Sequence, residues 1–177
     1  MFLWKGENPV AKRVMMLIDN LFEDSEALYP YYRMKEAGCD VTVVAAKKGT
    51  YHGKYGYPLE AERTPAEVDI KDFSAVIIPG GIAPDRIRIK PGMVDIVRKA
   101  VEKGLVVAAI CHGPQVLIEA GVLRGRRATS YISVKTDLVN AGARYEDSPV
   151  VVDGNIVTSR HPGDLPDFCR AVIEKLS

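Results

Sequence analysis

The chain has 177 residues, a formal net charge of +1 and an apolar fraction of 47%. This length is typical of one domain with a substantial core, and no run of about 18 apolar residues predicts a membrane span. Lys and Arg are scattered among an almost equal number of acids, so no basic stripe predicts nucleic-acid binding. We expect a single domain over residues 12–177, preceded by a short N-terminal extension over residues 1–11, with neither nucleic acid nor membrane as partner.

The cysteine pattern excludes two common kinds of site. Cys39, Cys111 and Cys169 are widely spaced and form no C-x-x-C pair for a metal or a redox disulfide. Their odd number, without a secretory signal in the first residues, favours a reducing compartment. We therefore expect a cytoplasmic protein without a bound metal, in which Cys39 and Cys169 pack in the core or on a helix face.

Apolar runs and helical patterns alternate along the chain. They predict strands over residues 13–18, 40–46, 75–78 and 105–110, helices over residues 25–37, 93–103, 114–120, 134–140 and 164–175, and hairpins over residues 51–57 and 150–159. Pro30 should bend the first helix, and Asp164 is the expected N-cap of the last. Strands that alternate with helices predict an α/β fold with a parallel sheet covered on both faces.

Polar residues follow several of the predicted strands. In a parallel sheet, ligands bind outside the carboxyl ends of the strands. The residues found there include Asp19-Asn20 through Glu23, then Gly80-Gly81 through Asp85, then Cys111-His112, and finally Arg160-His161. An acid, a glycine pair, a thiol, an imidazole and a guanidinium are thus predicted to meet at one edge of the sheet.

Cys111 is the central candidate among these residues. It follows the buried run Val106–Ile110, and Gly113-Pro114 opens a helix directly after it, which predicts a tight strand-to-helix turn resembling a nucleophile elbow. The helix N-terminus should lower the thiol pKa by up to about 1.5 units. The alternative is that Cys111 simply packs, as most free cysteines do. The turn favours a nucleophile.

The proton relay around Cys111 is open at the level of sequence. His112 is its immediate neighbour, so a direct Cys–His relay is one reading, and action on substrate protons or a purely structural histidine are others. Glu23 is either a simple helix-start acid or a neutral, protonated partner that donates a hydrogen bond to the sulfur.

The loop after residue 78 predicts oxyanion contacts. The backbone N–H groups of Gly81 and His112 are the expected donors, with Gly80 at the rim, although a Gly-Gly pair after a strand is more often a simple turn. Asp85 either caps a helix or orients a histidine.

Four blocks in order along the chain resemble the ThiJ/PfpI family, most closely its PfpI-type intracellular proteases and deglycases. They are Phe22-Glu23-Asp24, Pro79-Gly80-Gly81-x-Ala83-Pro84-Asp85, Ala109-Ile110-Cys111-His112-Gly113-Pro114-Gln115 and Gly121-Val122-Leu123-Arg124-Gly125. The resemblance implies a flavodoxin-like three-layer sandwich of the class I glutamine amidotransferase type. It places the nucleophile at Cys111, its histidine at His112 and the elbow glutamate at Glu23.

The resemblance also implies a third, acidic member supplied by a neighbouring subunit at the position of Asp85. The family pattern commonly has Glu there, and the shorter Asp puts a triad across an interface in doubt. His161, with Arg160 beside it, is not a fixed feature of the family and either adds a second imidazole or merely lines the rim. Dimers assembled into hexamers are a further implication.

The expected activity is a cofactor-free glyoxalase III or deglycase reaction on methylglyoxal-type aldehydes or glycated adducts. A thiolate adds readily to an aldehyde, and nearby acids and bases can move the protons. Peptide hydrolysis is the alternative enzymatic function, although the sequence shows no extended groove. A cysteine-based peroxide sensor and a chaperone-like stress protein are the alternatives without catalysis.

Overall fold

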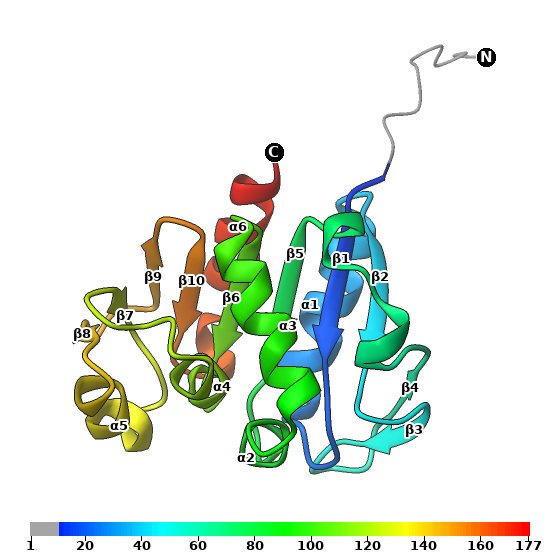
Figure 1. Ribbon diagram of the computed structural model, residues 1–177, viewed down its shortest axis with the longest axis horizontal. Helices are drawn as coiled ribbons and strands as arrows, with labels where there is room; N and C mark the ends of the chain where they lie inside the picture. The colour runs from blue at the N-terminus through cyan, green and yellow to red at the C-terminus, as the bar shows by residue number, and fades with distance from the viewer. Residues whose placement is uncertain (1–10) are drawn as a thin grey trace.

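The computed structural model describes residues 11–177 and is built around one six-stranded sheet (Figure 1). The strands lie in the order β2-β1-β5-β6-β10-β9. Their bounds are β1 Arg13–Leu17, β2 Asp40–Val44, β5 Ala75–Ile78, β6 Val106–Ile110, β9 Val150–Asp153 and β10 Ile156–Ser159. All neighbours are parallel except β9 and β10, which form an antiparallel hairpin at one edge.

The central strands are buried because helices cover both faces of the sheet. Every residue of β5, β6 and β10 is buried, which fits the continuous apolar sequences of β5 and β6, while β10 ends on the buried Thr158 and Ser159. Helices α1 (Asp24–Glu36) and α6 (Leu165–Leu176) pack together on one face, while α3 (Pro91–Glu102) and α4 (Pro114–Ala120) pack together on the other (Figure 1). The predicted three-layer α/β fold is confirmed.

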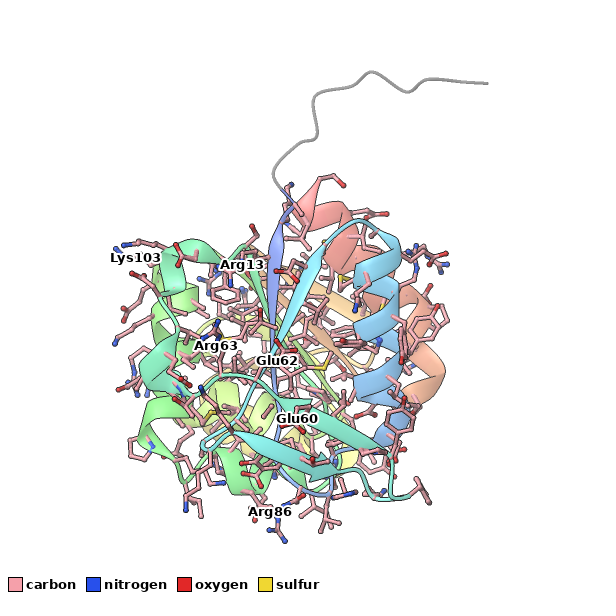
Figure 2. The ribbon with its side chains drawn as sticks, turned by 90° about the vertical axis from the view of Figure 1, so that its right-hand side faces the viewer. Arg13, Glu60, Glu62, Arg63, Arg86 and Lys103 are labelled. Atoms are coloured by element: carbon pink, nitrogen blue, oxygen red, sulfur yellow. The ribbon has the colours of Figure 1, made fainter. Side chains whose placement is uncertain are left out.

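Smaller elements surround the carboxyl ends of the strands. They are the hairpin of β3 (Gly49–His52) and β4 (Pro58–Ala61), helices α2 (Ala83–Ile87) and α5 (Lys135–Asn140), and the two-residue strands β7 (Arg127–Ala128) and β8 (Arg144–Tyr145). Figure 2 shows the β3–β4 hairpin near the β2 edge of the sheet, with charged side chains such as Glu60 on its surface. Single 3₁₀ turns span Pro65–Glu67, Ile70–Asp72, Ile132–Val134 and Pro162–Asp164.

Most predicted boundaries agree with the structure within two residues. The hairpin predicted over residues 51–57 extends over residues 49–61, because most of the predicted segment is the loop between β3 and β4. Helix α1 runs continuously through the buried Pro30 from Asp24 to Glu36. Asp164 is the N-cap residue of α6, as predicted, but its side chain makes no cap hydrogen bond and binds Arg160 instead. The predicted extension over residues 1–11 lies, apart from Ala11, outside the described residues. Within residues 11–177, no helix is long and apolar enough to cross a membrane.

Candidate active site

Cys111 lies on a strained turn between β6 and α4. Its φ angle is +62°, a left-handed conformation that costs a non-glycine residue roughly 1–2 kcal/mol. Backbone hydrogen bonds hold the turn, since Cys111 N donates to Ser159 O at 3.0 Å and Tyr131 N donates to Cys111 O at 2.9 Å. A Cβ at Gly113 would lie 2.6 Å from Ile78 O, so the chain needs glycine there. The predicted strand-to-helix elbow is confirmed.

The carboxyl group beside the Cys111 sulfur belongs to Glu26, in the first turn of α1. Glu26 is fully buried, and its Oε2 accepts a hydrogen bond of 2.8 Å from Gly80 N. A Cβ added to Gly80 would lie 2.4 Å from that oxygen and 3.0 Å from Cys111 Sγ, so glycine lets the two side chains meet. Burial is the main reason that the pKa of Glu26 rises to about 7.

The prediction that Glu23 binds the sulfur is therefore wrong. Glu23 precedes α1, lines the cavity and pairs through Oε2 with Lys54 Nζ at 3.0 Å. The carboxyl group with a raised pKa that was expected at Glu23 is that of Glu26. A sequence signal for it existed, because Glu26 lies four and eight residues before the buried Pro30 and Met34, on the same helix face.

The pKa of the Cys111 thiol is raised, whereas the sequence predicted that it would be lowered. Burial raises the pKa of Cys111 to about 12, and the neighbouring charge of Glu26 adds to this rise. The backbone N–H groups of Gly81 and His112 act against it by hydrogen bonding to the sulfur. Desolvation and the charge of Glu26 thus outweigh these two N–H groups. Protonation of Glu26 removes the like charge, so the thiolate forms most easily while Glu26 holds a proton.

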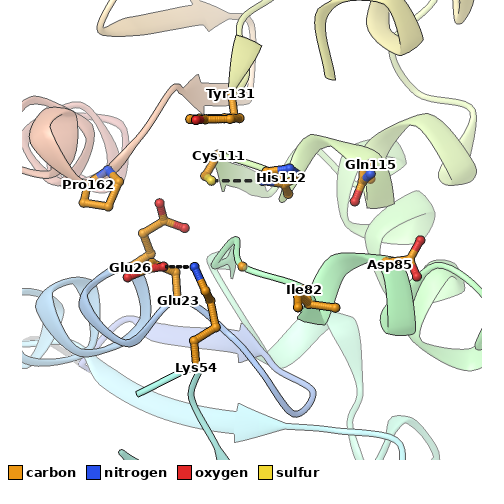
Figure 3. A pocket seen from close by; sticks show the side chains of 11 residues that line it. Glu23, Glu26, Lys54, Ile82, Asp85, Cys111, His112, Gln115, Tyr131 and Pro162 are labelled. Atoms are coloured by element: carbon orange, nitrogen blue, oxygen red, sulfur yellow. Dashed lines mark hydrogen bonds and ion pairs between the residues drawn. The ribbon is translucent and has the colours of Figure 1, made fainter. Parts of the chain in front are cut away.

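His112 contacts Cys111 directly, which is the geometry that a Cys–His relay requires. Its Nδ1 lies 3.2 Å from Cys111 Sγ (Figure 3). Its Nε2 lies 3.2 Å from Ser133 Oγ. The ring of Tyr131 stacks on the imidazole with centroids 5.2 Å apart. Burial lowers the pKa of His112, so the imidazole is neutral at pH 7 and able to accept a proton.

The two glycines after β5 have different roles. Gly81, with φ +82°, points its N–H to the Cys111 sulfur together with the N–H of His112. These are the two donors predicted for an oxyanion, and they face the reacting atom. The N–H of Gly80 instead holds Glu26, so Gly80 supports the acid rather than the rim.

Three other predicted residues do not join this group within the chain. Asp85 lies in α2 and lines the cavity, but its carboxyl forms no hydrogen bond or ion pair with any residue in the 11–177 range. Arg160 binds Asp164 and Asp147 in ion pairs of 2.9 Å each. His161 is half-exposed and lies 3.8 Å from Asp164. Neither Arg160 nor His161 lines the cavity, so their expected place at the rim is wrong.

These groups surround one cavity of about 460 Å³, whose lining is shown in Figure 3. The lining residues are Glu23, Glu26, Lys54, Gly81, Ile82, Asp85, Cys111, His112, Gln115, Tyr131 and Pro162. Sequence reasoning missed Glu26, Lys54, Gln115 and Tyr131. Over residues 11–177, no group of three or more His, Cys, Asp or Glu is arranged to hold a metal ion.

Lys54 reaches the cavity through the β3–β4 hairpin. The Asp24 carboxylate accepts hydrogen bonds of 3.0 Å from Tyr55 N and from Tyr57 N, which fixes the hairpin loop against the start of α1. A Cβ at Gly53 would lie 2.5 Å from this carboxylate. No local pattern predicts this contact, because it joins segments about 30 residues apart in the chain.

Residues 12–175 match the family model described as the DJ-1/PfpI family. The chain belongs to the DJ-1/PfpI family. It is 48% identical over 164 residues to "Deglycase PfpI" of Pyrococcus furiosus, which covers 93% of this chain and 99% of the relative. It is also 40% identical over 168 residues to YraA of Bacillus subtilis, named as a candidate cysteine protease, covering 94% of this chain and 99% of that protein.

A solved structure from Anabaena variabilis has a similar fold. It is a two-domain protein with DJ-1/ThiJ/PfpI-like and ferritin-like domains, and it matches this chain with a TM-score of 0.92 and 46% identity. The match covers 93% of this chain but 48% of the Anabaena chain, so the present chain spans about half of that longer protein. The family and the flavodoxin-like fold implied by the sequence motifs are both confirmed.

Proposed function

We propose that this protein is a cysteine-dependent enzyme that converts methylglyoxal-type aldehydes or glycated adducts without a cofactor. The observation that carries the proposal is the position of Cys111 Sγ, 3.2 Å from His112 Nδ1 and beside the protonatable Glu26. A nucleophile, a neutral base and an acid with a pKa of about 7 suit repeated proton transfers near neutral pH. The name of the Pyrococcus furiosus relative supports the same reaction class.

The first step is addition of the thiol to an aldehyde. The S–H proton passes to His112 Nδ1, and the sulfur forms a bond to the carbonyl carbon while the C=O electron pair moves onto oxygen. The N–H groups of Gly81 and His112 face the sulfur and are placed to hold the new alkoxide. Protonation of that alkoxide gives a hemithioacetal.

A 2-oxoaldehyde then needs an internal proton transfer. Removing the proton from the hemithioacetal carbon and returning one to the adjacent carbonyl carbon gives a thioester of a 2-hydroxy acid. Glu26 and His112 are the two groups beside the sulfur that can carry this proton. Water then cleaves the thioester and restores the thiol. The net change is the addition of one water molecule, so no external oxidant or reductant is required.

Peptide hydrolysis is the second candidate function. The name of YraA supports it, and so does the elbow geometry of Cys111. The volume of the cavity, about 460 Å³, suits a small molecule better than an extended peptide. Self-association into dimers and hexamers is a further part of this proposal that rests on the family resemblance. A cytoplasmic location is another part, which rests on the odd number of widely spaced cysteines and the lack of a secretory signal.

The test compares wild type with Cys111→Ala for methylglyoxal consumption and for peptide cleavage. We expect wild type to consume methylglyoxal and form the 2-hydroxy acid, and the variant to lose this activity at least about 1,000-fold. Aldehyde turnover that persists in the variant would refute the role of Cys111. Cleavage of peptide alone would favour the peptidase.

Two outcomes identify the non-enzymatic alternatives. A peroxide sensor predicts a mass gain of about 32 Da at Cys111 after peroxide treatment, without aldehyde turnover. A chaperone-like protein predicts that suppression of aggregation survives Cys111→Ala.

A further inference from the structure

Ser133 contacts the face of the catalytic histidine that is turned away from the thiol. It lies in the 3₁₀ turn Ile132–Val134, directly before α5, and its side chain is exposed. Its Oγ lies 3.2 Å from His112 Nε2. The mechanism above assigns no role to this hydroxyl group.

The imidazole is thereby held on three sides. Cys111 Sγ lies at Nδ1, Ser133 Oγ lies at Nε2, and the Tyr131 ring stacks at an interplanar angle of 24°. Stacking restricts the tilt of the ring but leaves it free to turn within its own plane or to flip. The hydroxyl contact selects the orientation in which Nδ1, rather than carbon, faces the sulfur.

The same contact fixes the useful tautomer. To accept the thiol proton, Nδ1 must carry a lone pair, so the ring hydrogen must be on Nε2. In that tautomer Nε2–H donates to Ser133 Oγ, which is an acceptor in hydrogen-bonding range. After the proton transfer both ring nitrogens carry hydrogen, and Ser133 still accepts from Nε2–H. The Ser133 hydroxyl group can therefore accept a hydrogen bond from the imidazole both before and after the proton transfer.

We propose that Ser133 is the positioning residue of His112, which holds the imidazole with Nδ1 facing the Cys111 sulfur. This inference rests on the proposed function for its effect on turnover.

A hydroxyl group and a carboxylate would give different pH profiles. A carboxylate at Nε2 stabilises the imidazolium and raises the pKa of the histidine, whereas a neutral hydroxyl group does not. The titratable and charged groups facing the cavity around His112 are Cys111, Lys54, Glu23, Glu26, Asp85 and Tyr131. Burial and the charge of Lys54 lower the pKa of His112, so the ring stays a base in mildly acidic solution.

The test measures Cys111 alkylation by iodoacetamide from pH 5 to pH 10, read at the Cys111 peptide by mass spectrometry. We expect Ser133→Ala to slow alkylation near pH 7 about 5–10-fold, the effect of one lost hydrogen bond. Ser133→Thr keeps the hydroxyl group and should restore the rate to within about twofold. Ser133→Asp places a carboxylate at Nε2, which should raise the pKa of His112 and shift the acid limb of the profile to higher pH. Thr136→Ala is the matched control, since Thr136 is an exposed residue of α5 with no side-chain hydrogen bond in the described chain.

Turnover of methylglyoxal gives the second readout. Ser133→Ala should lower kcat about 5–10-fold with little change in KM, because the hydroxyl group acts on the base and not on the substrate. A wild-type alkylation profile in Ser133→Ala, or no rescue by Ser133→Thr, would overturn the inference. So would a wild-type profile in Ser133→Ala combined with slow alkylation in Asp85→Ala. Alkylation needs no substrate, so failure of the proposed function leaves this test intact.

Discussion

Glu26 and Cys111 form a buried acid–thiol pair, with Glu26 Oε2 anchored to the backbone N–H of Gly80 at 2.8 Å. The other carboxyl oxygen, Oε1, is buried and has no further hydrogen-bond partner among residues 11–177. A buried carboxyl oxygen without a partner is costly when it carries charge, and protonation of the carboxyl removes that charge. The pair is therefore most stable with a neutral carboxyl, and this arrangement has measurable consequences.

Stability should fall as Glu26 ionises. Because the folded-state pKa of Glu26 is raised from 4.5 to about 7, the folded chain binds more protons than the unfolded chain between these values. The free energy of unfolding contributed by this group therefore decreases as the pH rises through that window. Glu26→Gln lacks this titration. Its free energy of unfolding, taken relative to that of wild type, should therefore be about 2–3 kcal/mol larger at pH 8 than at pH 5. Urea denaturation at both pH values measures the gain, with Glu102→Gln on α3 as the control. An equal difference at the two pH values would contradict the prediction.

The reactivity of Cys111 should respond to the charge of Glu26. The negative carboxylate helps to raise the thiol pKa, so Glu26→Gln should be alkylated faster than wild type at pH 9. Glu26→Leu also removes the charge but offers no hydrogen bond, and we expect an intermediate rate. Turnover should fall in both variants, less in Gln than in Leu. Slower alkylation of Glu26→Gln than of wild type at pH 9 would show that the carboxyl activates the thiol by another route.

The left-handed conformation of Cys111 should affect the relative stability of variants at this position. Both Cys111→Gly and Cys111→Ala remove the sulfur, but only glycine adopts φ +62° without strain. We expect Cys111→Gly to be about 1 kcal/mol more stable than Cys111→Ala in denaturant unfolding. Ala108→Gly, in the middle of β6, is the matched control and should lose stability instead. An alanine variant more stable than the glycine variant would mean that the elbow relaxes.

Asp24 should control the position of Lys54. Asp24→Ala removes the acceptor of two backbone N–H groups in the loop that carries Lys54, and should cost about 1–3 kcal/mol. Amide hydrogen exchange over residues 53–57 should increase, and KM for methylglyoxal should rise as the Glu23–Lys54 pair loosens. Asp137→Ala on the exposed surface of α5 is the control. Unchanged exchange in residues 53–57 would show that the hairpin is held by other contacts.

The strands, the helices and the elbow could be predicted because each depends on local pattern. Continuous apolar runs such as Val106–Ile110 mark buried parallel strands, and Gly113-Pro114 directly after Cys111 marks the start of a helix. The rule that ligands bind at the carboxyl ends of parallel strands then brought Gly81, Cys111 and His112 to one edge correctly. Arg160 and His161 follow a strand too, but ion pairing with Asp164 holds Arg160 away from the cavity.

The sequence by itself thus determined the α/β fold, the family and the strand-to-helix elbow at Cys111. Tertiary structure decided which groups touch the Cys111 sulfur. Glu26 rather than Glu23 meets the sulfur because α1 begins at Asp24 and turns Glu26 toward the sheet, where Gly80 leaves room for it. The hairpin loop that Asp24 holds places Lys54 at the cavity. Ser133, which contacts His112, lies in a turn 21 residues after it in the chain. Periodicity reports the local backbone, whereas contacts between distant segments depend on how the packed elements place their side chains.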